Sequence, residues 1–130
     1  MQTITWQWAA LVAAGGAAGA LARGTAAVLW VARFPWATLW VNVLGSLLIG
    51  WVAAKFPETA GAGASAGDVR CWRTLLATGF CGGFTTFSAF SLQTFEQFEK
   101  GQPALALANI VLSLALCLGG VWLGWKLGRW

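Results

Sequence analysis

Four long uncharged stretches divide the chain. They cover residues 1–22, 34–54, 74–95 and 101–125. Each has about the 20 residues that an α-helix needs to cross the hydrocarbon core of a bilayer. Tryptophans near their ends are typical of a membrane–water interface. The pattern predicts an all-α membrane protein with a single four-helix transmembrane domain over residues 1–130, whose helices cover about 5–32, 36–55, 69–98 and 103–127.

The third stretch carries an interruption that an ordinary transmembrane helix lacks. Gly82 and Gly83 each weaken a helix by roughly 1 kcal/mol relative to alanine. Thr85 and Thr86 add β-branched stiffness and hydroxyl groups that bond backbone. A broken helix persists in lipid only where protein or a water-filled cavity receives its freed backbone groups. We therefore expect helix 3 to be broken in mid-membrane, its first half ending near Phe80 and its second half beginning near Thr86.

Composition agrees with a membrane protein and argues against other classes. The chain is 58% hydrophobic and 9% charged, whereas a soluble domain carries about 25% charged residues. Its net charge of +4 comes from residues near helix ends, so no patch suited to nucleic acid forms. Three scattered cysteines without histidine support neither a disulfide framework nor a zinc site. No acid lies in a membrane stretch and no nucleophile has a base beside it, so we expect no enzyme.

Isolated polar residues inside the predicted helices each allow two interpretations. Arg23 is either an anchor that reaches for the interface or a cation at a water-filled entrance. Asn42 is either a hydrogen-bonding link between helices or part of a polar path. Asn109 and Ser113 are four residues apart and share a helix face, where the same two alternatives apply.

Apart from Arg23, the polar residues outline a neutral path. They include no acid that could couple transport to protons. The members of this path donate hydrogen bonds, and phenylalanine edges carry positive electrostatic potential, so the path suits a small anion. Four helices enclose little pore by themselves, so we expect an oligomer. The polar residues are Asn42, Thr85, Thr86, Ser88, Asn109 and Ser113, with Phe87 and Phe90 beside them.

The interrupted segment also resembles a known signature. Residues 79–91, GFCGGFTTFSAFS, closely resemble the signature of the Fluc/CrcB family of fluoride channels. Residues 19–23 (GALAR) are similar to the family's first-helix motif, residues 42–46 (NVLGS) to its second-helix motif, and residues 109–113 to its fourth-helix pattern. Length and helix count also agree, so the resemblance covers essentially the whole chain.

The resemblance implies an antiparallel, dual-topology homodimer in the inner (plasma) membrane, with two pores that export fluoride passively. It implies that Phe87 and Phe90 turn their ring edges toward fluoride and that Asn42 donates a hydrogen bond in the pore. It further implies hydroxyl groups along the pore, a vestibule cation, and a structural Na⁺ at the dimer interface held by backbone carbonyls. The hydroxyl groups would come from Thr86, Ser88 and Ser113, and the vestibule cation would be Arg23. The carbonyls would be those of Gly82 and Thr85 of both subunits.

Two positions depart from the pattern of that family. Ala89 stands where threonine is common, and it has no hydroxyl to offer to a polar path. Gln93 stands where glutamate is common, and it keeps hydrogen-bonding ability but cannot ionise.

The basic residues favour one orientation in the membrane. Five of them lie on the side of the N-terminus, against two on the opposite side, so the positive-inside rule predicts a single topology. Dual insertion therefore rests on the resemblance. The five are Lys55, Arg70, Arg73, Lys126 and Arg129, and the two are Arg33 and Lys100.

Two other functions compete with the anion channel. A small multidrug-resistance-type four-helix transporter would need a glutamate in helix 1, where this chain has Gly15 and Gly16. A membrane assembly protein without transport would account for the glycine stripes but leave the polar break in helix 3 unexplained.

Overall fold

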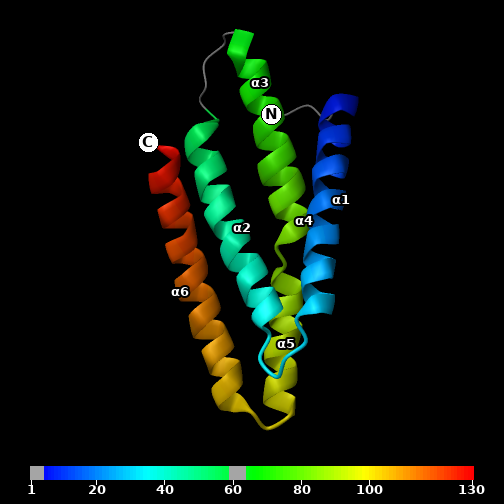
Figure 1. Cartoon of the computed structure of the whole chain (residues 1–130), viewed down its shortest axis with the longest axis vertical. Coiled ribbons are helices and arrows are strands. Elements are labelled where there is room, and N and C mark those ends of the chain that lie inside the picture. The colour runs from blue at the N-terminus through cyan, green and yellow to red at the C-terminus, as the bar shows by residue number, and fades with distance from the viewer. Residues whose placement is uncertain (1–4, 59–63) are drawn as a thin grey trace.

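The protein folds as a bundle of four helical spans (Figure 1). The structure is a computed structural model that describes residues 5–58 and 64–130. Each span is long and apolar enough to cross a membrane, and the described residues form no strand. The predicted all-α membrane architecture is confirmed. The elements are α1 (Trp6–Leu29), α2 (Trp36–Lys55), α3 (Ala64–Arg73), the π-helix η1 (Thr74–Cys81), α4 (Gly82–Phe84), α5 (Phe87–Glu99) and α6 (Pro103–Gly128).

The ends of the helices follow ordinary capping chemistry. The Thr5 hydroxyl accepts a hydrogen bond from the Trp8 N–H at 3.2 Å and caps α1. This helix ends at Leu29, three residues before the predicted end, because the chain uses residues 30–35 to reverse direction into α2. Pro103 occupies the first turn of α6, where its missing N–H costs nothing.

Helix 3 is broken in the predicted region, and its second half begins at Phe87, one residue from the predicted start, but the break is shorter than predicted. Gly82 keeps helical dihedral angles, φ −61° and ψ −37°, and the helix continues to Phe84. Thr85 and Thr86 are extended, with ψ of 157° and 116°. The prediction that the first half ends near Phe80 is therefore wrong. The threonines form the break, and the two glycines lie inside the helix that precedes it.

The glycines before the break serve close packing against α1. A Cβ atom at Gly83 would collide with the Gly16 carbonyl oxygen, and one at Gly19 would lie 2.7 Å from the Phe84 nitrogen. Gly15 likewise faces the backbone of η1. Small residues let membrane helices approach this closely. Packing, rather than helix breaking, therefore explains Gly83.

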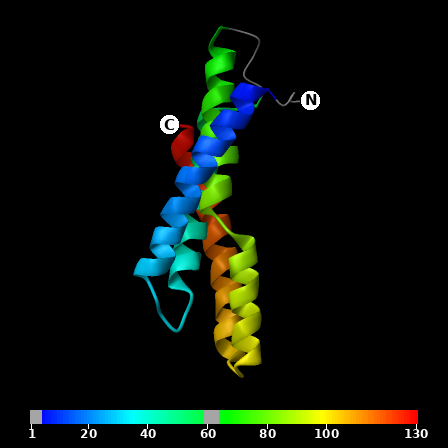
Figure 2. The same cartoon turned by 90° about the vertical axis from the view of Figure 1, so that its right-hand side faces the viewer.

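The break lets one span pack against two different helices. Before the break, η1 and α4 lie against α1, whereas α5 lies against α6 after it. Figure 2 shows α1 crossing the upper half of the third span and α5 beside α6 in the lower half. The α2 helix packs along α6 and contacts both sides of the break. The change of partner places the extended threonines against the middle of α2.

We expect the α2–α6 contact to be sensitive to a single methyl group at Gly124. A Cβ atom there would lie 2.9 Å from the Trp51 backbone nitrogen and would collide with the Leu47 carbonyl. Gly124→Ala should lower the free energy of unfolding by about 2 kcal/mol, the usual scale of overpacking, in a thermal or denaturant titration in detergent. Gly119→Ala is the matched control on the same helix, because no atom lies within 4 Å of its Cβ position. Equal effects of the two substitutions would contradict the packing argument.

Candidate functional site

A cavity of about 290 Å³ lies against the break of helix 3. It is bounded by α2, η1, α5, α6 and the extended threonines. The structure thus brings together predicted pore residues from three spans that are distant in sequence. Those that line the cavity are Asn42, Thr86, Phe87, Phe90 and Ser113.

Asn42 holds the backbone of the break with both ends of its amide. Its Nδ2 donates to the Thr86 carbonyl at 3.0 Å, and its Oδ1 accepts from the Thr86 N–H at 2.7 Å. These are the backbone groups that a continuous helix would pair internally. Of the two interpretations open from sequence, a link between helices is present. The second N–H of the amide is left for another acceptor, because a primary amide has two donors.

Thr86 turns the extended break into the start of α5. Its hydroxyl accepts from the Ala89 N–H at 3.2 Å, which makes Thr86 the N-cap residue. The Ser88 hydroxyl lies 3.2 Å from the same oxygen. Thr85 instead donates its hydroxyl back to the Cys81 carbonyl at 2.8 Å, while its methyl group packs on Gly45. Thr85 therefore ends the helix before the break, and Thr86 begins the helix after it.

The two phenylalanines form a pair at the start of α5. The ring centroids of Phe87 and Phe90 are 5.5 Å apart, with planes inclined at 47°. Phe90 is partly buried, whereas Phe87 is 76% exposed. A large apolar ring this exposed at membrane depth marks a face that lipid or another protein chain covers.

Asn109 and Ser113 lie on α6 but in different surroundings. Asn109 is 1% exposed and donates from Nδ2 to the Thr94 hydroxyl at 2.8 Å. Ser113 reaches both the cavity and Asn109, whose Oδ1 lies 3.4 Å from its hydroxyl. Asn109 therefore lies one turn from Ser113, buried between α5 and α6 and outside the cavity wall. Thr94 was absent from the predicted path, although its spacing of four from Phe90 could have indicated it.

Arg23 contacts the break from the opposite side. Its Nε donates to the Gly83 carbonyl at 3.1 Å. In a continuous helix that carbonyl would accept from Phe87, so the arginine replaces a backbone partner that the break removes. Arg23 and Ser88 do not line the cavity. Arg23 therefore links α1 to the third span, in addition to any role at the entrance of a pore.

The carbonyls of Gly82 and Thr85 are also freed by the break. The Thr86 N–H, which would normally pair with the Gly82 carbonyl, donates to Asn42. The Ala89 N–H, which would normally pair with the Thr85 carbonyl, donates to the Thr86 hydroxyl. Gly82 is exposed, and its Cβ position has no atom within 4 Å. Both carbonyls are hard oxygen donors of the type that suits a small cation such as Na⁺.

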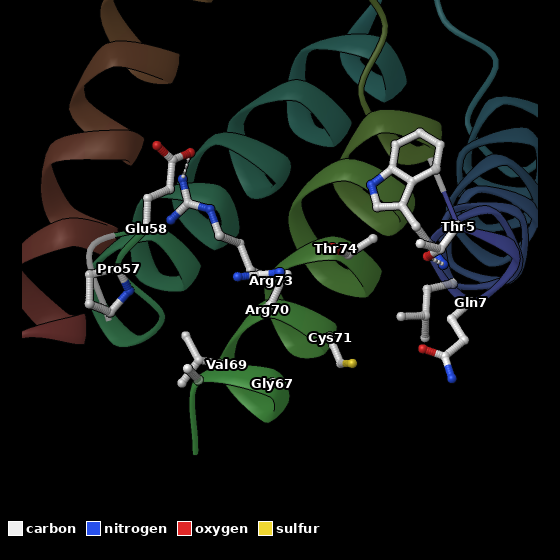
Figure 3. A pocket seen from close by; sticks show the side chains of 13 residues that line it. Thr5, Gln7, Pro57, Glu58, Gly67, Val69, Arg70, Cys71, Arg73 and Thr74 are labelled. Atoms are coloured by element: carbon white, nitrogen blue, oxygen red, sulfur yellow. Dashed lines mark hydrogen bonds and ion pairs between the residues drawn. The ribbon is translucent and has the colours of Figure 1, made fainter. Parts of the chain in front are cut away.

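A second cavity, of about 570 Å³, lies at the end of the bundle near the N-terminus (Figure 3). Arg73 crosses its wall, donating to the Phe56 carbonyl and pairing with Glu58, both at 2.8 Å. Arg70 also lines this cavity. Arg73 therefore ties the end of α2 to α3.

Comparison with known proteins identifies the family. Residues 10–125 match the family described as CrcB-like protein, Camphor Resistance (CrcB). The chain belongs to the CrcB family. It is 42% identical over 123 residues to the fluoride-specific ion channel FluC of Coxiella burnetii (strain CbuK_Q154), covering 92% of this chain and 95% of the relative. It is 46% identical over 117 residues to the fluoride-specific ion channel FluC of Rhodospirillum rubrum, covering 87% and 88%. It is 43% identical over 138 residues to that of Erythrobacter litoralis (strain HTCC2594), covering 99% and 98%.

Membership of the CrcB family confirms the resemblance seen in the sequence. CrcB proteins of this kind are ion channels rather than enzymes, and the four apolar spans make this one a multi-pass membrane protein. The membership also decides against the multidrug-resistance-type transporter as the alternative. The roles of individual pore residues stay predictions, which the geometry of the break makes specific enough to test.

Proposed function

We propose that this chain is a fluoride channel of the plasma membrane that exports fluoride passively through pores formed by two antiparallel copies. The fluoride channel function follows from membership of the CrcB family and from relatives named fluoride-specific ion channels. The observation that carries the proposal in the structure is the cavity at the broken third span, which joins polar donors to a phenylalanine pair.

The cavity has the chemistry that a dehydrating anion needs. Fluoride must replace its water shell with hydrogen-bond donors or positive ring edges as it enters a narrow pore. The free N–H of Asn42 supplies a donor, while Phe87 and Phe90 supply ring edges. The Ser113 hydroxyl, which donates to Asn109, would turn its single O–H to the anion instead. The Thr86 and Ser88 hydroxyls lie beside them, and Asn109 supports Ser113 from behind. None of the described residues that line the cavity carries a carboxylate, so anions meet no fixed negative charge from them.

The exposed position of Phe87 supports a dimer. In a single chain this ring stands 76% exposed, so one chain forms only part of a pore wall. A second copy packed against this face would enclose the path, and a twofold arrangement gives two such pores. Dual topology is the arrangement that we propose, although five of seven basic residues near helix ends favour one side.

The freed carbonyls support a structural Na⁺ in such a dimer. Gly82 and Thr85 each offer a carbonyl without its helical partner, and Gly82 is exposed on the surface of the chain. Contributed by both copies, these oxygens would hold the ion at the dimer interface. Bound there, Na⁺ supplies positive charge to backbone oxygens that lipid cannot solvate.

Transport needs only the membrane potential as a driving force. A negative interior drives an anion outward with about 2.3 kcal/mol per charge per 100 mV. The four candidate spans carry few charged residues, and the cavity wall carries none, so no coupling group is required. Arg23, which contacts Gly83 on the other side of the break, would attract anions to the vestibule.

Purified protein in liposomes tests this function directly. Vesicles loaded with potassium fluoride should release fluoride once valinomycin provides a path for potassium. Vesicles loaded with potassium chloride should release no more chloride than protein-free vesicles, because chloride is larger and a weaker hydrogen-bond acceptor. Equal release of the two anions, or no release of fluoride, would contradict the proposal.

A further inference from the structure

The contact between α5 and α6 beyond the break is unusually polar for a membrane interior. Thr94 and Gln97 are the buried residues of α5, at 8% and 5% exposure. Asn109 and Ser113 are buried on the facing part of α6. Polar side chains between membrane helices normally hydrogen-bond across the contact. We call the group of Thr94, Asn109 and Ser113 the α5–α6 strip.

Hydrogen bonds join the α5–α6 strip into a continuous chain. Ser113 donates to Asn109, and Asn109 donates to the Thr94 hydroxyl. Thr94 in turn donates to the Phe90 carbonyl at 2.8 Å. Because Ser113 and Phe90 also line the cavity at the break, the strip begins at the cavity. From there it runs along α5 toward the end of that helix.

Gln97 continues the α5–α6 strip but has no partner within the described residues. It lies three positions after Thr94, on the same face of α5. Its Nε2 and Oε1 are both buried and make no hydrogen bond to the described part of the chain. Gln93, one turn earlier, has a buried Oε1 that also makes no hydrogen bond to the described part of the chain. A buried amide without partners is strongly disfavoured, so this position favours a polar ligand over apolar packing.

We propose that Gln97 is an anion-coordinating residue at the outer end of the pore, where its amide N–H groups bind fluoride as it leaves or enters. This inference rests on the proposed channel function. Gln97 lies in the last turn of α5, which ends at Glu99, so it stands between the α5–α6 strip and the aqueous end. A glutamine amide offers two donors and no charge. That chemistry can bind a small anion without holding it so tightly that conduction stops.

Substitutions at Gln97 test the role by fluoride flux from liposomes. Gln97→Leu removes the donors and suits an apolar helix contact, so it should keep or raise the unfolding temperature in detergent. We expect it to lower fluoride flux about tenfold, as the loss of one hydrogen bond to an ion would. Gln97→Glu keeps the shape but presents a carboxylate, so it should lower flux at least as much at neutral pH. Gln97→Met, which keeps the length of the side chain, replaces Gln97→Leu if the leucine variant unfolds.

The control is Gln7→Leu, which removes an exposed glutamine from α1 and should leave flux unchanged. Wild-type flux in both Gln97→Leu and Gln97→Glu would overturn the inference, because a site that binds only water tolerates both changes. Failure of the wild-type protein to pass fluoride would instead overturn the channel function. The two failures are therefore distinct.

Discussion

Replacing Phe87 with isoleucine is expected to lower fluoride flux by at least roughly tenfold while the protein still folds. The ring is 76% exposed in the single chain, so its own subunit depends little on it for packing. Isoleucine preserves apolar bulk but lacks the positive ring edge. We take the contact of a ring edge with a desolvated anion to equal a weak hydrogen bond to a charged group, about 1.5 kcal/mol, and each 1.4 kcal/mol is a factor of ten. Flux from liposomes measures the effect.

Phe90→Ile should act in the same direction, because the two rings form one pair with centroids 5.5 Å apart. Phe95→Ile is the matched control. Phe95 lies on the same helix and is 61% exposed, but it does not line the cavity. Retained flux in both Phe87→Ile and Phe90→Ile would mean that the pair only packs against a neighbour. Loss of flux in Phe95→Ile would mean that any change on α5 is harmful.

Replacing Asn42 with alanine is expected to reduce both stability and conduction. The change leaves the N–H and the carbonyl of Thr86 without their partners. An unpaired buried backbone group costs about 1–3 kcal/mol, so the free energy of unfolding should fall by at least about 2 kcal/mol. Denaturant or thermal titration in detergent measures this loss. Fluoride flux should fall as well, because the position of Phe87 depends on the same break.

Ser46→Ala provides the control for Asn42. Ser46 lies one turn further along α2 and lines the same cavity, but it makes no side-chain hydrogen bond to the break. We expect its substitution to change stability by less than about 0.5 kcal/mol, as substitutions without such contacts do. If Asn42→Ala is equally mild, the amide does not hold the break in the membrane.

The helices of this protein are predictable from hydropathy because the bilayer imposes strict demands. A span must be long and apolar, and its charges must lie near its ends. The predicted α2, residues 36–55, has the bounds seen in the structure, and the predicted α6 differs by one residue. The break in helix 3 is also visible in sequence, as a polar interruption within an apolar stretch. The residue at which the break begins is not, because glycine is as suited to close helix packing as to helix breaking.

The candidate site is predictable in part. Most polar residues near the break could be named from the sequence, and five predicted pore residues line one cavity. Their partners were not visible. Thr94 and Gln97 were overlooked because they lie near the charged end of α5, where polar residues are ordinary. Only their burial against α6 makes them unusual.

The amino-acid sequence is sufficient to establish the class of the protein, its four spans, the presence of a break and a family of fluoride channels. Those features depend on local composition and on motifs within single spans. Which side chains hydrogen-bond to the backbone groups freed by the break depends on the fold. Asn42 reaches Thr86 across 44 positions, and Arg23 reaches Gly83 across 60. Such pairings arise because α1 and α2 both pack on the third span, and no local pattern encodes which carbonyl each side chain meets.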